Sequence, residues 1–201
     1  MYETNPFIGF YQNRNLKGVA GKTYSLKVEA LGQTATASTT LLAPIKLDSA
    51  WFQVQKGLDS LGYMWAMLSD PPTPGNCYRW FAKRLGKNGD TTFVPPDESV
   101  FNDQIFNGRN FEFFYGRGAL PSSKAADDTN AEAGYFKVHD TVVIKFCTID
   151  NIAYKFYSTY YFQLNNSGNP FGSPAPLQGN VTGALGIWCG YGSSFDTVIC
   201  K

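Results

Sequence analysis

Apolar and polar residues alternate with a period of two in several runs of this chain, and this feature most constrains the fold. The run Tyr135–Ile149 is long and rich in β-branched residues, which is typical of a strand. Thr23–Ala30 and Cys77–Leu85 alternate in the same way, and Leu61–Leu68 is a short apolar run. Together these runs predict an all-β fold, either a β-sandwich or a partly closed barrel, with one or two short helices.

The spacing of these runs also predicts which strands pair. Thr23–Ala30 and residues 34–42 flank the turn Leu31-Gly32-Gln33 and are expected to form a hairpin. Residues 61–68 and 77–85 are expected to pair across a loop rich in proline. Further strands are predicted at residues 45–55 and 110–116, and a closing strand at 183–191, where glycines permit close backbone approach; an alternating, strand-like segment follows it.

Two segments have helical signals. Residues 97–106 begin with Asp97 as a candidate N-cap and end at Asn107-Gly108, a stop signal. Residues 151–164 place apolar side chains four positions apart, with Asp150 as the N-cap and Gly168 just past the end. A strand remains the alternative for this second segment because its aromatic residues are also β-prone.

Composition excludes several functional classes. The 201 residues carry 17 basic and 16 acidic side chains and contain no long basic cluster, which argues against a nucleic-acid partner. No apolar run approaches the roughly 20 residues that span a bilayer. Aromatic residues make up 16% of the chain, which suits both a β-sheet core and a surface that contacts carbohydrate.

The four cysteines do not form a metal site of known spacing. Cys77, Cys147, Cys189 and Cys200 include no CxxC pair, and His139 is the single histidine. Buried free thiols are the simpler interpretation, and one or two disulfides are the alternative in an oxidising compartment. We expect no metal and no cofactor.

The sequence gives little support for any catalytic residue. His139 adjoins Asp140, but neighbouring strand residues point to opposite faces, so the two are not expected to form a catalytic pair. Glu98, Asp103 and Glu112 are candidate carboxylates for glycoside hydrolysis, although no spacing selects two of them. Residues 127–130 are rich in oxygen ligands but lack the register of a calcium loop. We therefore assign no catalytic residue.

The best candidate binding residues are Phe113, Phe114 and Tyr115. They are consecutive, so at least one of them must face outward if the segment is a strand. An exposed aromatic side chain here would form a binding edge, and packing in the core is the alternative. The four tryptophans lie within apolar runs and are interpreted as core residues: Trp51, Trp65, Trp80 and Trp188.

Five ordered motifs, spread over Gly21 to Ile199, resemble one family. They read AGKTYSLKVEALGQTATASTTLLAPIKLDSAWF, SDPPTPGNCYRW, VFNDQIFNGRNFEFF, FKVHDTVVIKFCTIDNIAYKFYSTY and NPFGSPAPLQGNVTGALGIWCGYG. The chain is similar to the Bacteroidetes family known as domain of unknown function 4249. It departs from the family at His139-Asp140, where the family has Gly-Asp.

The resemblance implies an exported lipoprotein of the cell envelope, at the outer membrane or its periplasmic or extracellular face. Residues 1–43 would be the tail of a truncated N-terminal immunoglobulin- or transthyretin-like β domain. Residues 44–201 would be the family's C-terminal β-rich domain. The family's signal peptide and lipid-acceptor cysteine are not recognised in this sequence, so we expect that the N-terminal part is missing.

The function expected from this resemblance is that of a non-enzymatic accessory or binding component near a TonB-dependent transport system. Its partner would be an outer-membrane receptor or a surface glycan or peptide. The alternatives are a carbohydrate- or peptide-processing hydrolase with a carboxylate pair, and a structural, adhesin-like module.

Overall fold

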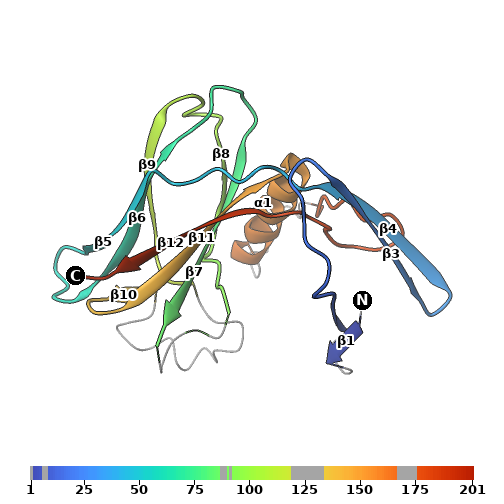
Figure 1. Cartoon of the computed structure of the whole chain (residues 1–201), viewed down its shortest axis with the longest axis horizontal. Coiled ribbons are helices and arrows are strands. Elements are labelled where there is room, and N and C mark those ends of the chain that lie inside the picture. Colours follow the sequence, from blue (N-terminus) through green and yellow to red (C-terminus); the bar gives the residue numbers. More distant parts are fainter. Residues whose placement is uncertain (1, 6–8, 87–89, 91, 119–133, 167–175) are drawn as a thin grey trace.

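The predicted β-sandwich is present in the computed structural model, which describes residues 2–5, 9–86, 90, 92–118, 134–166 and 176–201. Two four-stranded antiparallel sheets face each other, and a separate hairpin projects from them (Figure 1). The first sheet contains β5 (Ser49–Val54), β6 (Leu61–Ser69), β9 (Asn110–Tyr115) and β10 (Phe136–Lys137). The second contains β12 (Gly192–Ile199), β11 (Thr141–Ile149), β7 (Cys77–Leu85) and β8 (Val100–Asn102).

The core lies between the two sheets and is rich in aromatic rings. Alternate residues of β6 point inward and are fully buried, because a strand presents successive side chains to opposite faces. Opposite them, Trp80 and Tyr78 of β7 are also fully buried, and Tyr78 stacks on Phe146 of β11 with ring centroids 5.2 Å apart. The inner cluster consists mainly of Met64, Ala66, Leu68, Tyr78, Trp80, Phe113, Phe136, Val142, Ile144 and Phe146.

The outer face of the second sheet packs against α1 (Asn151–Asn165), the predicted second helix. As expected, Asp150 caps this helix, and its carboxylate accepts a hydrogen bond of 2.7 Å from the backbone N–H of Ala153. The carboxylate also accepts one of 3.0 Å from the hydroxyl of Thr39. The cap therefore joins the helix to the hairpin, while Ala153 lies in a second buried cluster beside Cys77, Cys147 and Ile149. Gly168, the expected stop, lies outside the described residues.

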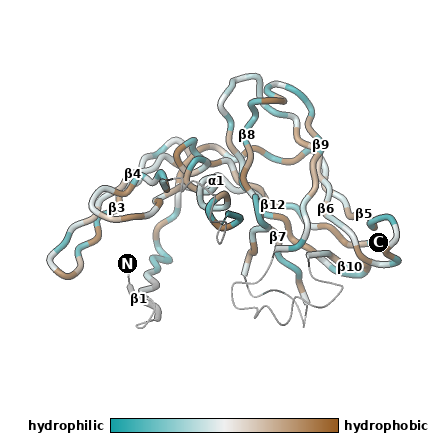
Figure 2. The backbone as a smooth tube through the Cα atoms, turned by 180° about the vertical axis from the view of Figure 1, so that it is seen from behind, coloured by the Kyte–Doolittle hydropathy of each residue, from teal (hydrophilic) through white to brown (hydrophobic). Residues whose placement is uncertain are grey.

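The predicted hairpin is formed by β3 (Thr23–Ala30) and β4 (Gln33–Thr40) and extends away from the sandwich (Figure 2). The segment that precedes β12 holds the free edge of β4. The backbones of Thr36 and Thr182 exchange two hydrogen bonds of 2.8 and 3.0 Å, and the side chain of Asn180 donates to the carbonyl of Ser38. A second small hairpin, β1 (Tyr2–Asn5) and β2 (Phe10–Gln12), lies near the N-terminus.

Three predictions about strands were wrong in detail. The strands β6 and β7 do not pair; they lie in opposite sheets, because the loop between them crosses the sandwich. The run 135–149 is divided into β10 and β11 by a turn in which His139 has a φ of +78°. The closing strand is Gly192–Ile199, the alternating segment, whereas residues 183–191 form no strand. In each case a turn or a tertiary neighbour, not the local pattern, sets the boundary.

The predicted helix at 97–106 is also wrong. Glu98 has a φ of +55°, which the first turn of a helix cannot adopt, and Val100–Asn102 pairs with β7 as β8. The apolar residues Val100 and Phe101 therefore pack as strand residues on the sandwich. The sequence also predicts a loop at the small, polar residues 117–134 and a corner at 169–174; most of the first and all of the second lie outside the described residues.

Candidate functional site

The outer face of the first sheet carries a continuous row of aromatic side chains. The antiparallel register places Trp51 of β5 directly opposite Trp65 of β6, and Trp65 directly opposite Phe114 of β9. Directly opposed residues project from the same face of a sheet, so these three rings meet across three strands. Tyr63, two residues before Trp65, and Tyr135, just before β10, extend the row. We call these five residues the aromatic face.

The rings of the aromatic face contact one another in sequence. Ring centroids are 6.4 Å apart for Trp51 and Trp65, and 4.7 Å apart for Trp65 and Phe114. The distance is 5.1 Å both from Phe114 to Tyr63 and from Tyr63 to Tyr135. The planes of these last three pairs are inclined by only 31–39°, and centroids about 5 Å apart at such angles require the ring faces to overlap. Neighbouring rings of the row therefore cover part of one another's faces.

Polar residues border the aromatic face. Gln53 and Glu112 are exposed on the same side of the sheet, and Ser69 donates a hydrogen bond of 3.0 Å to the amide oxygen of Asn110. Phe114 is 48% exposed, whereas the other four rings are half-buried. An apolar aromatic centre with a polar border is the usual composition of a protein interface.

The three predicted binding residues do not lie on one face of the first sheet. Phe114 belongs to the aromatic face, but Phe113 is only 9% exposed and packs edge-on against Trp80 in the core. Tyr115 also points inward, where burial raises the pKa of its hydroxyl above the ordinary value. One of the three residues therefore faces outward, the minimum that strand geometry required.

Sequence reasoning missed the other members of the aromatic face. The interpretation of all four tryptophans as core residues holds for Trp80, which is fully buried, but Trp51 and Trp65 lie on the outer face and are half-buried. The available signal was the alternation within Leu61–Ser69, where Tyr63 and Trp65 are both out of phase with the buried Met64 and Ala66. The pairing of Trp51 and Phe114 with Trp65 could not be read from that pattern.

The candidate catalytic residues are dispersed. His139 is exposed in a turn at a positive φ, a position that suits the glycine expected there for the family. Asp103 is 3% exposed and accepts hydrogen bonds from the backbone N–H groups of Gly75 and Asn76. Glu112 borders the aromatic face, and Glu98 lies near the end of α1, where its carboxylate accepts from Asn165. Residues 127–130 lie outside the described part of the chain.

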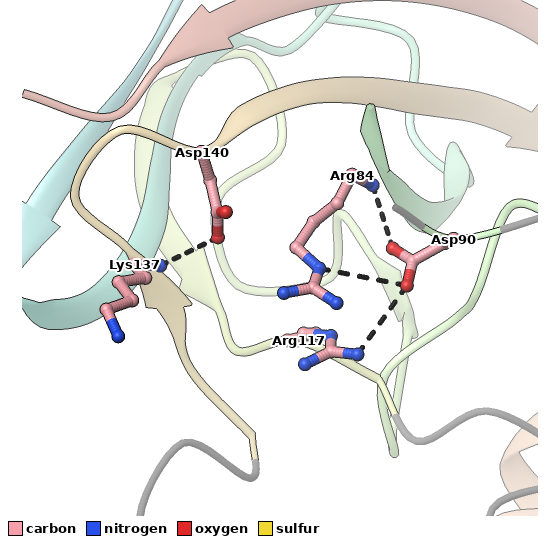
Figure 3. A network of polar contacts seen from close by, with 5 residues as sticks. All are labelled: Arg84, Asp90, Arg117, Lys137 and Asp140. Carbon is pink, nitrogen blue, oxygen red and sulfur yellow. Dashed lines mark hydrogen bonds and ion pairs between the residues drawn. The ribbon is translucent and has the colours of Figure 1, made fainter. Parts of the chain in front are cut away.

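A buried carboxylate at the end of β7 joins two arginines (Figure 3). Asp90 Oδ1 lies 3.8 Å from Nε of Arg84 and 3.6 Å from Nη2 of Arg117, and Oδ2 accepts a hydrogen bond of 2.8 Å from the Arg84 backbone. The Asp90 side chain is 3% exposed. This network ties the end of β7 to the segment after β9, and its single carboxylate is paired with cations, so we assign it a structural role.

A second buried cation lies between the second sheet and α1. Arg79 is 6% exposed, and its guanidinium carbon lies 3.5 Å from the ring centroid of Tyr157. Its Nη1 donates a hydrogen bond of 2.7 Å to the hydroxyl of Tyr191, and Nη2 one of 3.5 Å to that of Tyr161. Among the described residues no carboxylate forms an ion pair with it. Aromatic faces and hydroxyl oxygens thus replace a counter-ion, which fastens the helix to the sheet.

The four cysteines are free thiols, and burial is the main influence on each of them. Burial raises the pKa of Cys77 and of Cys189 from 9.0 to about 11, and that of Cys200 to about 12. Burial also raises the pKa of Cys147. These thiols stay protonated at neutral pH, so none of them is an activated nucleophile.

The raised thiol pKa values predict a loss of stability at alkaline pH. Between pH 9 and about 11 the folded chain retains protons on Cys77, Cys189 and Cys200 that the unfolded chain releases. Because the folded state binds more protons in this window, the free energy of unfolding falls as the pH rises. Urea unfolding at pH 8 and pH 10.5 measures the fall, and a smaller fall in variants with Cys77, Cys189 or Cys200 replaced by alanine identifies the thiols as its source. A fall of unchanged size in all three variants would contradict the prediction.

Comparisons with known proteins identify the family but no closer relative. No group of three or more potential metal ligands is present in the described part of the chain, and no described helix is long and apolar enough to cross a membrane. No curated protein and no solved structure matches the chain significantly. A family model described as Domain of unknown function (DUF4249) matches residues 1–194, nearly the whole chain. The chain therefore belongs to the family of domain of unknown function 4249.

Proposed function

We propose that this protein is a non-enzymatic binding component of the cell envelope that docks a partner protein on its aromatic face. The observation that carries the proposal is the row Trp51, Trp65, Phe114, Tyr63 and Tyr135 on the outside of the first sheet. An apolar surface of this kind is costly to leave in water, and on soluble proteins such patches mark interaction sites.

The geometry of the rings favours a protein over a glycan as the partner. A sugar ring stacks on the open face of an aromatic ring, and the contacts of Trp65 and Tyr63 with Phe114, at centroid distances of 4.7 and 5.1 Å, reduce the open face of each ring. These rings and the half-buried Met67 beside them fit the apolar side chains of another protein, because protein interfaces are enriched in aromatic residues and methionine. Glu112 of β9 and Lys137 of β10 are the charged strand residues that the register places on this side of the sheet, and their opposite charges leave little attraction for nucleic acid.

The hydrolase alternative has less support from the described surface. A cavity of about 410 Å³ between β8 and α1 is lined by a single acidic residue, Glu98. Another of about 420 Å³ beside the loop after β6 is lined by Asp103 alone among acidic residues. Glycoside hydrolysis requires two carboxyl groups within about 10 Å of each other across the bound sugar. The envelope location and the neighbouring TonB-dependent transporter rest on the family resemblance.

A site-specific photo-crosslinker tests the proposal in cells of the native host. A photoreactive phenylalanine analogue replaces Phe114 in one strain and Phe195 in the other; Phe195 is 58% exposed on β12 and serves as the matched control. We expect one discrete crosslinked protein from position 114 only, in the membrane fraction, identified by mass spectrometry as an outer-membrane receptor. Adding Trp65→Ser to the first strain should abolish the crosslink.

Purified proteins then measure the contribution of the face. Phe114→Ser and Trp65→Ser are each expected to weaken binding of the identified partner about 30-fold, the effect of losing a hot-spot aromatic side chain. Phe195→Ser should leave the affinity within about twofold. Equal crosslinking from both positions, or a cytosolic location of the protein, would contradict the proposal. Saturable binding on a glycan array that Trp65→Ser abolishes would replace the protein partner with a glycan.

A further inference from the structure

Among the strands that the structure describes, β3 pairs with β4 alone, so its outer edge has no strand beside it. In the hairpin Lys27 lies directly opposite Thr36 of β4. The N–H and C=O of Thr36 bond to Thr182 on the far side of β4, so Lys27 and Thr36 are a non-hydrogen-bonded pair. The N–H and C=O of Lys27 therefore point away from β4, as do those of Ser25 and Glu29, two residues before and after it. No described residue bonds to these six backbone groups.

The hairpin leaves this edge accessible. It projects from the sandwich, and exposure rises toward its tip, where Leu31 is 103% exposed (Figures 1 and 2). Its two faces differ in chemistry: Leu26, Val28 and Ala30 lie on one, and Lys27 and Glu29 on the other. Val28 is 45% exposed. An accessible edge with a half-exposed apolar stripe is a template for pairing with another strand.

The charges on β3 are arranged for pairing with an identical strand. Nζ of Lys27 lies 2.5 Å from Oε1 of Glu29 on the polar face, and the two side chains are 63% and 65% exposed. In an antiparallel pair of β3 strands with Val28 on the two-fold axis, Lys27 of each copy lies opposite Glu29 of the other. Both pairs are hydrogen-bonded positions, because the backbone groups of Lys27 and Glu29 point outward. On the opposite face Val28 meets Val28, and Leu26 meets Ala30.

We infer that β3 pairs edge to edge with β3 of a second copy of this chain, and that Lys27 and Glu29 select the register. The four strands then form one continuous sheet with two-fold symmetry, an isologous interface. Moving the axis to Lys27 would place Lys27 opposite Lys27, which like-charge repulsion disfavours. Moving the axis to Leu26 would pair more residues of the two β3 strands. It would, however, leave Lys27 and Glu29 without an oppositely charged residue across the interface.

Charge reversal and charge exchange test this inference. The wild-type chain is expected to associate reversibly to a dimer in sedimentation-velocity runs over a range of concentrations. Lys27→Glu places glutamates opposite each other twice, and Glu29→Lys does the same with lysines, so each is expected to weaken the dimer about tenfold or more. The double variant Lys27→Glu/Glu29→Lys restores both cross-strand pairs and should restore the wild-type dissociation constant.

A matched control separates the effect of the β3 register on dimer formation from the effect of the chain's net charge. Lys46→Glu changes the net charge as Lys27→Glu does, at an exposed position before β5, and should leave the dimer unchanged. Circular dichroism and thermal unfolding confirm that every variant is folded. A wild-type chain that is monomeric at all concentrations overturns the inference. Single reversals that have no effect, or a double variant that fails to recover, overturn it as well.

Discussion

Replacement of Trp80 by alanine is expected to lower the free energy of unfolding by about 3–5 kcal/mol, the usual cost of truncating a fully buried aromatic side chain. Trp80 has no exposed surface and lies between the two sheets, with its ring centroid 5.8 Å from that of Phe113 and 5.6 Å from that of Tyr115. Its removal leaves a cavity that two packed sheets cannot close by small shifts. Urea unfolding followed by circular dichroism measures the loss.

Two further variants serve as controls for the loss of unfolding free energy in Trp80→Ala. Trp80→Phe keeps most of the ring and removes the indole Nε1, which has no hydrogen-bond partner among the described residues, so it should cost about 1–2 kcal/mol. It also remains measurable if the alanine variant does not fold. Trp51→Ala removes the same side chain from the half-exposed outer face and should cost about 1 kcal/mol. Equal losses for Trp80→Ala and Trp51→Ala would show that the burial of the two rings is not as described.

The contrast between Trp80 and Trp51 shows where sequence reasoning was sufficient and where it was not. The alternation in Cys77–Leu85 predicted a strand at the observed bounds, and the short apolar run Leu61–Leu68 predicted a strand that ends one residue before the end of β6. Side-chain direction along a strand depends only on parity. Parity alone does not say which face is inside. In β7 both faces are buried, because Tyr157 of α1 covers Arg79 and Tyr191 covers Phe81 on the outer face. Arg79 and Phe81 are therefore only 6% and 9% exposed.

Helix α1 was predictable because its signals are local. The capping carboxylate of Asp150 acts within a few residues. The four-residue period indicated a helix but not its buried face: Ile152, Tyr160 and Leu164 are 41–50% exposed, whereas Ala153 and Tyr161 are the buried residues of the helix. The failed helix at 97–106 had an equally good cap in Asp97, but the pairing of Val100–Asn102 with β7 prevailed over local preference. The positive φ of His139 likewise divided a run that its composition marked as one strand.

The aromatic face could not be predicted as a site for the same physical reason. Phe114 was identified, but its neighbours Trp65 and Trp51 come from strands about 50 and 63 positions earlier, and only the register of pairing brings the rings together. Composition indicated that aromatic residues were available for a binding surface. Composition did not indicate which aromatic residues would be buried in the core.

Replacement of Asp103 by alanine is the second change with a large expected effect, about 2–4 kcal/mol of unfolding free energy. Asp103 Oδ2 accepts hydrogen bonds of 2.9 Å from the backbone N–H groups of both Gly75 and Asn76, and Oδ1 accepts one of 3.1 Å from Gly75. The carboxylate is 3% exposed, so alanine would leave backbone donors without a partner in a site that water barely reaches. These bonds hold the loop by which the chain crosses from β6 in one sheet to β7 in the other.

The amides that lose protection in Asp103→Ala test the prediction as well as the loss of unfolding free energy does. Hydrogen exchange at the amides of Gly75 and Asn76 should accelerate strongly in Asp103→Ala, because local opening no longer breaks those bonds. Asp103→Asn keeps one acceptor oxygen and should cost roughly half as much. Glu112→Ala, which removes an exposed acidic side chain from the first sheet, should stay within about 0.5 kcal/mol of wild type. If Asp103→Ala matched Glu112→Ala in stability, the carboxylate would not be holding the loop, and a role for Asp103 in binding or catalysis would have to be considered instead.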